Sequence, residues 1–181
     1  MNKFNEMKNL FELANNKYLI EQKKLIQSGV SERTLCGQLM LYLNEANEKT
    51  LYKQYYVDVE YNRNVNERLK TIKDGEGEII TINCDLILHS RGENLVEDNL
   101  IALEMKKSIG SRSAKEKDRE RLKALTRQSF DNIWSYDGQS LPEHVCRYIL
   151  GVYYEINISR MEALIEYYQD GKLLHHYIIN I

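Results

Sequence analysis

The sequence lacks the features that define several large classes of protein. Its three cysteines, Cys36, Cys84 and Cys146, are an odd number and lie far apart along the 181 residues. They fit neither a disulfide framework nor the paired spacing of a zinc site, which excludes a small disulfide-stapled scaffold and indicates a reducing compartment. No apolar run has the length of a signal peptide, or of the ~20 residues that span a bilayer. We therefore expect a soluble, cytoplasmic protein with no membrane partner.

Three catalytic signatures are also missing. The chain contains no Gly-rich phosphate-binding loop, no Gly-x-Ser-x-Gly elbow and no His-Glu-x-x-His motif. These absences argue against a nucleotide triphosphatase, a serine hydrolase of that type and a zinc protease. His175 and His176 are adjacent, and neighbours on a strand face opposite sides, so joint ligation of one metal ion is not expected.

Length and composition predict one folded domain. Hydrophobic residues make up 43% of the chain and charged residues 29%, which excludes a disordered protein because enough apolar surface is available to bury. No repeat, low-complexity tract or linker divides residues 1–181. Within this single domain we expect a helical extension over 1–28 and a C-terminal hairpin over 160–181.

Periodicity predicts the secondary structure. Apolar residues recur at three- and four-residue intervals over 3–27 and 32–47, which is typical of helices. A further, highly charged helix is expected over 113–129. Alternating or continuous apolar runs predict strands over 55–62, 79–89, 100–106 and 147–156. Asp170-Gly171 separates two more strand-like runs and is a typical hairpin turn. The order is helix, helix, three strands, helix, three strands, in one α+β or α/β domain.

The strands 79–89 and 100–106 are joined by a polar loop, so we expect an antiparallel hairpin with two different faces. The core face is wholly apolar and carries Ile82, Cys84, Leu86, Leu88, Ile101, Leu103 and Met105. The other face carries Asp85, Ile87, His89, Ala102, Glu104 and Lys106. A symmetrical loop that sets His89 opposite Leu100 also sets Asp85 opposite Glu104. Two carboxylates and one ammonium group then meet on one patch.

This patch suits a divalent cation. Two carboxylates ~5 Å apart repel each other unless a cation lies between them. Their hard oxygen atoms suit Mg²⁺, which keeps several waters for a substrate phosphate to displace. Lys106 is placed to hold or deprotonate the attacking water and to stabilise charge on phosphorus. The alternative is a solvated sheet face with one Glu–Lys pair.

Glu32 lies at the start of the second predicted helix, in line with that helix's apolar stripe. This position directs its carboxylate toward the core side of the helix, where it is able to join the patch. The alternative is that an acidic residue in the first turn only stabilises the helix dipole.

Five segments together resemble the PD-(D/E)xK nuclease superfamily, in particular its small, poorly characterised prokaryotic and phage members. The segments are Ser31-Glu32-Arg33, Asp58-Val59-Glu60-Tyr61-Asn62-Arg63, Cys84-Asp85-Leu86-Ile87-Leu88-His89, Leu103-Glu104-Met105-Lys106-Lys107-Ser108, and Asp118 with Arg121 and Leu122. The resemblance covers residues 31–155 and implies a restriction-endonuclease-like αβββαβ core with a mixed central sheet. Cys84 stands where the family's pattern has proline.

The resemblance implies a role for each matching residue. Asp85 and Glu104 bind Mg²⁺ or Mn²⁺, Glu32 supports the metal site from the helix, and Lys106 positions or activates water. For Asp118 we expect helix packing or capping rather than ligation. The implied function is metal-dependent hydrolysis of phosphodiester bonds, most likely in DNA, by an endonuclease-type enzyme.

Charge distribution supports a nucleic-acid partner although the whole chain carries only −2. Residues 106–127 include nine basic and three acidic side chains, a balance of +6 against −8 for the remainder. Candidate contacts to the phosphate backbone are Arg63, Lys107, Arg112 and Lys115. The alternative for the charges is a solvated helix with internal salt bridges. The alternative for the chain is a non-catalytic nucleic-acid- or protein-binding module, with the helix over 3–27 as a docking surface or a homodimer contact.

Overall fold

The N-terminal part of the chain forms three helices on one side of a sheet. The structure is a computed structural model that describes residues 2–61, 71–73, 79–81, 83–94, 96–128 and 146–181. The helices are α1 (Lys3–Glu21), α2 (Lys23–Gln27) and α3 (Glu32–Asn47). Side chains cap two of them, because Asn2 accepts the amide of Phe4 and Ser31 accepts the amide of Thr34. No helix in the described ranges is both long and apolar enough to cross a membrane.

The helix predicted over 32–47 is confirmed with its bounds, whereas the helix predicted over 3–27 is two helices. Gln22 has φ −102° and ψ 14° and separates α1 from α2. The apolar stripe of α1 is buried in the main core, where Met7, Phe11 and Tyr18 have no exposed surface. Most of the apolar surface considered for docking is therefore already used within the chain.

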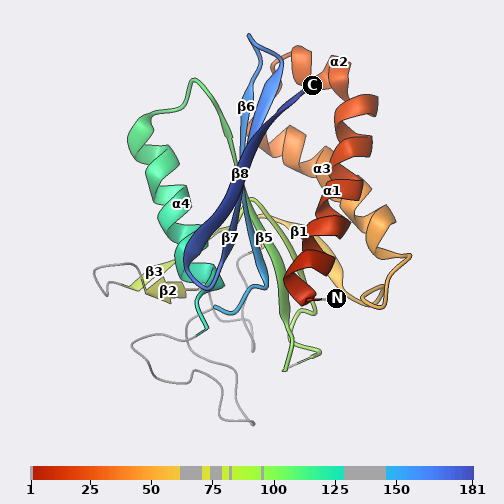
Figure 1. The fold of residues 1–181 in the computed structure, drawn as a ribbon, viewed down its shortest axis with the longest axis vertical. Helices are drawn as coiled ribbons and strands as arrows, with labels where there is room; N and C mark the ends of the chain where they lie inside the picture. The colour runs from red at the N-terminus through yellow and green to blue at the C-terminus, as the bar shows by residue number, and fades with distance from the viewer. Residues whose placement is uncertain (1, 62–70, 74–78, 82, 95, 129–145) are drawn as a thin grey trace.

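The centre of the fold is a six-stranded mixed sheet in the order β1-β4-β5-β6-β7-β8 (Figure 1). Its strands are β1 (Tyr56–Val59), β4 (Leu86–His89), β5 (Asn99–Lys107), β6 (Leu150–Asn157), β7 (Glu162–Gln169) and β8 (Lys172–Asn180). Only β5 and β6 run parallel, and α4 (Arg112–Thr126) lies between them in the chain. A separate pair, β2 (Thr71–Lys73) and β3 (Ile79–Thr81), is antiparallel. The expected α/β class with a mixed central sheet is thus confirmed.

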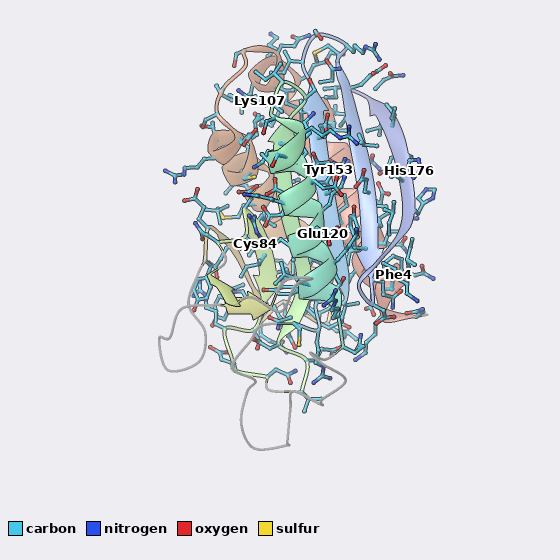
Figure 2. All side chains as sticks on the ribbon, turned by 90° about the vertical axis from the view of Figure 1, so that its left-hand side faces the viewer. Phe4, Cys84, Lys107, Glu120, Tyr153 and His176 are labelled. Carbon is cyan, nitrogen blue, oxygen red and sulfur yellow. The ribbon has the colours of Figure 1, made fainter. Side chains whose placement is uncertain are left out.

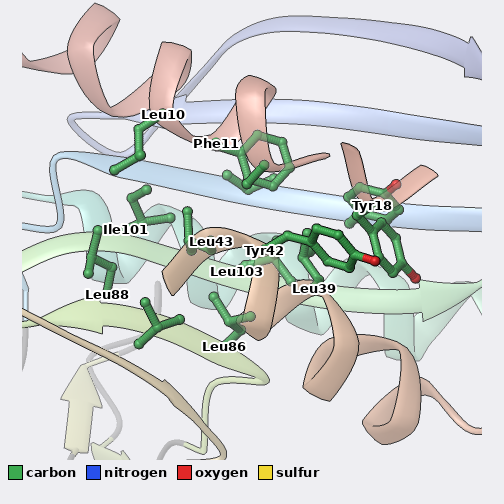
Figure 3. Close-up of a cluster of buried hydrophobic side chains, with 14 of the residues drawn as sticks. Leu10, Phe11, Tyr18, Leu39, Tyr42, Leu43, Leu86, Leu88, Ile101 and Leu103 are labelled. Atoms are coloured by element: carbon green, nitrogen blue, oxygen red, sulfur yellow. The ribbon is translucent and has the colours of Figure 1, made fainter. Parts of the chain in front are cut away.

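Both faces of the sheet are covered. Figure 1 places α1 and α3 on one side and α4 on the other. The larger core lies under α1 and α3, and Figure 3 shows that it is built from side chains of both helices and of the sheet, among them Phe11, Leu39 and Leu103. A smaller core under α4 includes Ile87 and Leu122. The predicted C-terminal hairpin is confirmed, since Asp170 and Gly171 both have positive φ, 51° and 75°, as the tight turn requires.

The strand predicted over 79–89 is wrong as a single element. Its first residues form β3 and its last residues form β4, while 83–85 lie outside both strands. Side chains make the bonds there: the Asp85 carboxylate accepts the amide of Met105 at 2.7 Å, and the Cys84 thiol donates to the Leu103 carbonyl at 3.2 Å. The strand predicted over 55–62 is also shorter, ending at Val59.

The break between β3 and β4 changes which side of the sheet some of these residues face. Cys84 packs in the smaller core under α4, not beside Leu86 in the larger core as expected. The second face of the hairpin is buried as well, because Ile87 and Ala102 have no exposed surface beneath α4. The alternative of a solvated sheet face is therefore wrong, and charged groups on this face must be satisfied within the protein.

The expected register of the hairpin is confirmed from Leu86 to Leu88. β4 and β5 are antiparallel with Leu86 opposite Leu103, so the next positions in line are Asp85 and Glu104. His89 lies opposite Asn99, not Leu100, because the register shifts after Leu88. The loop beyond is closed by Asp98, whose Oδ1 accepts the Ser90 hydroxyl at 2.5 Å and the Gly92 amide at 2.8 Å.

Gly151 allows α4 to lie close to β6, which makes it a test of this packing. A Cβ atom at Gly151 would lie 2.9 Å from Thr126 Cγ2 and 3.1 Å from Tyr168 Cβ. We expect Gly151→Ala to lower the free energy of unfolding by about 1–3 kcal/mol through overpacking. Gly37→Ala is the control, since a Cβ atom added at Gly37 in α3 would have nothing within 4 Å. It should raise the free energy of unfolding by about 0.5–1 kcal/mol. Urea unfolding measures both, and an unchanged Gly151→Ala midpoint would contradict the close packing.

Candidate functional site

Six charged residues from four parts of the chain meet beside β5, between α4 and the start of α3. Figure 2 looks onto α4 with the strands behind it. We call this set the carboxylate cluster; its members are Glu32 at the start of α3, Asp85 before β4, Glu104 and Lys106 on β5, and Asp118 and Arg121 on α4. The structure thus brings together the four catalytic candidates from the sequence analysis. It adds two residues of α4 to them.

Asp85 and Glu104 each use one carboxylate oxygen. Asp85 Oδ2 accepts the Met105 amide, and Glu104 Oε1 accepts Arg121 Nη1 at 2.6 Å. Glu104 is only 1% exposed, and its Oε2 is buried with no hydrogen-bond partner among the described residues. An unpaired buried carboxylate oxygen is costly, so this atom marks a place where a cation would stabilise the protein.

Lys106 lies between carboxylates from two helices. Its Nζ is 3.1 Å from Asp118 Oδ2 on α4 and 3.6 Å from Glu32 Oε2 on α3. The β5 strand therefore places the ammonium group between the helices that cover opposite faces of the sheet. The lysine is held in the cluster and is partly buried, with 20% of its side chain exposed.

Glu32 contacts β5, so its role is not limited to stabilising the dipole of its own helix. Its Oε1 accepts the backbone amide of Lys107 at 2.7 Å, at the end of β5. The neighbouring Arg33 forms a two-point ion pair with Glu60, which ties the start of α3 to the chain just after β1. Glu32 thus acts on Lys106 and on the β5 backbone.

Asp118 and Arg121 are two further functional candidates. The sequence alone did not show where their side chains lie. They lie one helical turn apart, and Arg121 Nη1 is 3.2 Å from Asp118 Oδ1. Asp118 was expected to pack or cap a helix; instead it is buried against Lys106 and Arg121. Their i, i+3 spacing before the buried Leu122 was the signal that both lie on the sheet-facing side of α4.

Burial shapes the acid–base properties of the cluster. It raises the pKa of Glu104 to about 8, with Arg121 opposing the rise and Asp85 and Asp118 adding to it. Burial also raises the pKa of Asp85, against the stabilising Met105 amide and Lys106. Burial alone would lower the pKa of Lys106, but Asp118, Asp85 and Glu32 outweigh it and raise that pKa. Lys106 is therefore a cation at neutral pH.

The formal charges of the cluster leave room for a divalent ion. Four carboxylates against one ammonium and one guanidinium group give a formal charge of −2 when all are ionised. Oxygen donors of this kind suit Mg²⁺ or Mn²⁺, and Glu104 Oε2 is a buried donor without a partner among the described residues. The residues present fit such an ion chemically. Within the ranges that the structure describes, however, no three His, Cys, Asp or Glu side chains form a group able to hold a metal.

Ion pairs to the sheet hold α4 over the cluster. Arg119 binds both oxygens of Glu166 on β7 at 2.9 Å and lies 4.0 Å from the centre of the Tyr153 ring. Lys115 is 2.8 Å from Glu155 on β6. These partly buried pairs fix the helix that carries Asp118 and Arg121, and so they position the site.

Many cations of the basic segment are thus engaged inside the protein. Lys115, expected to contact phosphates, also donates to the Ser108 carbonyl, and Lys107 donates to the Gly29 carbonyl at 2.8 Å. Arg112 and Lys117 are exposed and form no ion pair within the described part of the chain. Arg63 lies outside the described residues. The alternative of internal salt bridges is confirmed for Lys115, Arg119, Arg121 and Lys123.

A second charged group lies at the other end of β4. His89, expected on the same face of the hairpin as Asp85 and Glu104, is 1% exposed and lies 2.9 Å from Asp58. Arg91 binds both oxygens of that carboxylate and stacks 4.0 Å over the Tyr56 ring. Burial opposes ionisation of Asp58, but the bonds from His89 and Arg91 outweigh it and lower its pKa. Its carboxylate is well bonded, and we interpret the group as structural.

Comparison with known proteins adds no further evidence on function. No family model matches the chain, and no curated protein or solved structure is significantly similar to it.

Proposed function

We propose that this protein is a divalent-metal-dependent nuclease of the PD-(D/E)xK type that hydrolyses phosphodiester bonds in DNA. The observation that carries the proposal is the meeting of Asp85, Glu104 and Lys106 in the partly buried carboxylate cluster, whose six groups carry a formal charge of −2 when all are ionised. Glu104 and Asp118 are almost fully buried, and a buried carboxylate oxygen without a partner lowers the stability of the protein unless a cation binds it. A divalent metal ion would bind these carboxylates, and a phosphate group would pair with Lys106.

The order of elements supports the same proposal. Apart from the β2–β3 pair, the elements from α3 to β6 follow one another as α3, β1, β4, β5, α4 and β6. This is the αβββαβ order of a restriction-endonuclease-like core, with the site at the β4–β5 hairpin where that family carries it. Helices α1 and α2 precede this core, and the β7–β8 hairpin follows it.

The proposed mechanism assigns a task to each side chain. Asp85 and Glu104 would hold the ion, which when bound supplies Lewis-acid activation of the phosphate and of water. Lys106 is held as an ammonium ion by Asp118 and Glu32, so we assign it to orienting water and stabilising negative charge on the phosphate rather than to removing a proton. Glu32 and Asp118 keep the lysine in place.

The competing proposal is a non-catalytic module that retains this fold. One observation favours it: Arg121 and Lys106 already lie against Glu104, Asp118 and Glu32, so these groups are partly neutralised by the protein itself. In that case α4 and its exposed Arg112 and Lys117 would serve binding alone.

Metal binding and DNA cleavage decide between the two. Mn²⁺ at about 100 times its dissociation constant should raise the melting temperature by about 5–10 °C. Asp85→Asn should remove this shift because it deletes one charge of the ion site. The same protein, incubated with linear, circular, single-stranded and branched DNA, should cut at least one substrate only when Mg²⁺ or Mn²⁺ is present. Binding of DNA without cleavage and without a Mn²⁺ shift would favour the module.

A further inference from the structure

We propose that Arg121 is a positioning residue that bonds Glu104 in the metal-free protein and weakens the affinity of the site for the divalent ion. This inference rests on the nuclease proposal, since it concerns how the same site is loaded. It assigns to α4 a direct influence on metal binding, through a guanidinium group that shares a carboxylate with the ion.

The geometry places Arg121 where it acts on the ion site. Its Nη1 is 2.6 Å from Glu104 Oε1 and 3.2 Å from Asp118 Oδ1, so one guanidinium nitrogen bridges two carboxylates. Glu104 projects from the middle of the buried strand β5 and is 1% exposed, whereas the Arg121 side chain is 28% exposed. The arginine thus reaches into the cluster from its open side.

A second arginine on the same helix forms an ion pair in which both carboxylate oxygens are bonded. Arg119 binds both oxygens of Glu166, one of which also accepts the Tyr168 hydroxyl at 2.6 Å. Arg121 binds one oxygen of Glu104 and leaves the buried Oε2 without a partner among the described residues. The two pairs lie two positions apart on α4 but differ in this respect, which indicates that Glu104 keeps an oxygen for another cation.

Electrostatics gives the direction of the effect. With all groups ionised, the cluster carries a formal charge of −2 with Arg121 and −3 without it. A positive charge a few ångströms from the ion repels it, and removal of that charge should tighten Mn²⁺ binding by about tenfold or more. The metal-free protein should lose stability at the same time, because the buried Glu104 Oε1 then lacks its hydrogen-bond donor.

The experiment compares Arg121→Gln with Arg119→Gln, which removes a similar ion pair from the same helix. Mn²⁺ binding is measured by electron paramagnetic resonance of the free ion and by the melting temperature across a Mn²⁺ titration. Arg121→Gln should melt below wild type in EDTA and bind Mn²⁺ at least about tenfold more tightly. Arg119→Gln should also melt lower but keep the wild-type dissociation constant. Arg121→Lys, which keeps the charge, should bind as wild type does.

The outcomes separate this inference from the nuclease proposal. If Mn²⁺ binds wild type and Arg121→Gln binds it no more tightly, the inference on Arg121 is wrong and the metal site stands. If neither protein binds Mn²⁺, both proposals fail. If Arg121→Gln is unfolded in EDTA, Mn²⁺ should restore its folding, and absence of this rescue overturns the inference. A gain in Arg119→Gln equal to that in Arg121→Gln overturns it too.

Discussion

Lys106→Met should lower the rate of metal-dependent DNA cleavage by about 10²–10³-fold, the usual cost of removing one electrostatic group from a transition state. Methionine keeps the length and packing of the lysine stem but removes the ammonium group between Asp118 and Glu32. In the proposed mechanism no other described cation is placed to take over, because Arg121 is bonded to Glu104. The measurement is a single-turnover cleavage rate with saturating Mg²⁺ and enzyme in excess.

Lys17→Met is the control for this prediction. Lys17 also pairs with a carboxylate, Glu45, but joins α1 to α3 on the far side of the sheet. Its replacement should leave the cleavage rate unchanged. Melting temperatures of both variants verify that the fold is retained. Cleavage by Lys106→Met at the wild-type rate would remove Lys106 from the mechanism.

Metal-free protein should lose stability as the pH rises from about 5 to about 9. Burial raises the pKa of Glu104 from its ordinary value of 4.5 to about 8, so the native state binds this proton more tightly than the unfolded state does. The stabilisation is present in full below the unfolded pKa and is lost as the pH rises through the native pKa. One pKa unit corresponds to about 1.4 kcal/mol, so the free energy of unfolding should fall by about 3–5 kcal/mol.

Glu104→Gln tests the source of this pH dependence. Glutamine keeps the shape of the side chain and cannot ionise, so most of the slope between pH 5 and 9 should disappear when urea unfolding is followed in EDTA. Burial also raises the pKa of Asp85, which leaves a smaller slope of the same sign. Glu166→Gln is the matched control, because both oxygens of that buried carboxylate are bonded; it should keep the wild-type slope. An equally steep slope in Glu104→Gln would show that Glu104 is already ionised throughout this range.

Local signals predicted the elements that depend on local interactions. The helix over 32–47 follows from its cap Ser31 and its apolar spacing, and the structure has α3 with these bounds. The hairpin turn at Asp170-Gly171 follows from two residues that tolerate positive φ. The strand predicted over 100–106 is β5 with one further residue at each end. Each of these features is decided by a few neighbours in the chain.

The division of 79–89 into β3 and β4 was not predictable from alternation. A period of two is equally consistent with one strand or with two strands separated by an irregular segment. At this point the Asp85 carboxylate accepts the Met105 amide, in place of a backbone hydrogen bond between the two strands. Met105 is 20 residues away in the chain, so the signal does not exist locally. The same event sends Cys84 into the core under α4.

The basic segment shows the same limit for function. A balance of +6 over 106–127 indicated a surface for phosphates. The partners of Lys115 and Arg119 are Glu155 and Glu166, 40 and 47 residues further along, on strands that the segment packs against. Charge counted along the chain therefore overestimated the cations that are free to bind a substrate.

Periodicity and spacing predicted one domain of helices and strands, the hairpin register beside Asp85 and Glu104, and Lys106 on the same face. The family resemblance added the α/β class and the role of Glu32. Hydrophobic period and motif spacing are properties of residues that are close in the sequence. The tertiary structure was needed to show that Glu104 and Asp118 are buried beneath α4 and that Asp118 pairs with Lys106. It was also needed to show that Arg121 bonds one oxygen of Glu104, while the other oxygen has no partner among the described residues. Burial and ion pairing depend on which elements pack together, and for charged groups they set both the pKa and the affinity for a cation.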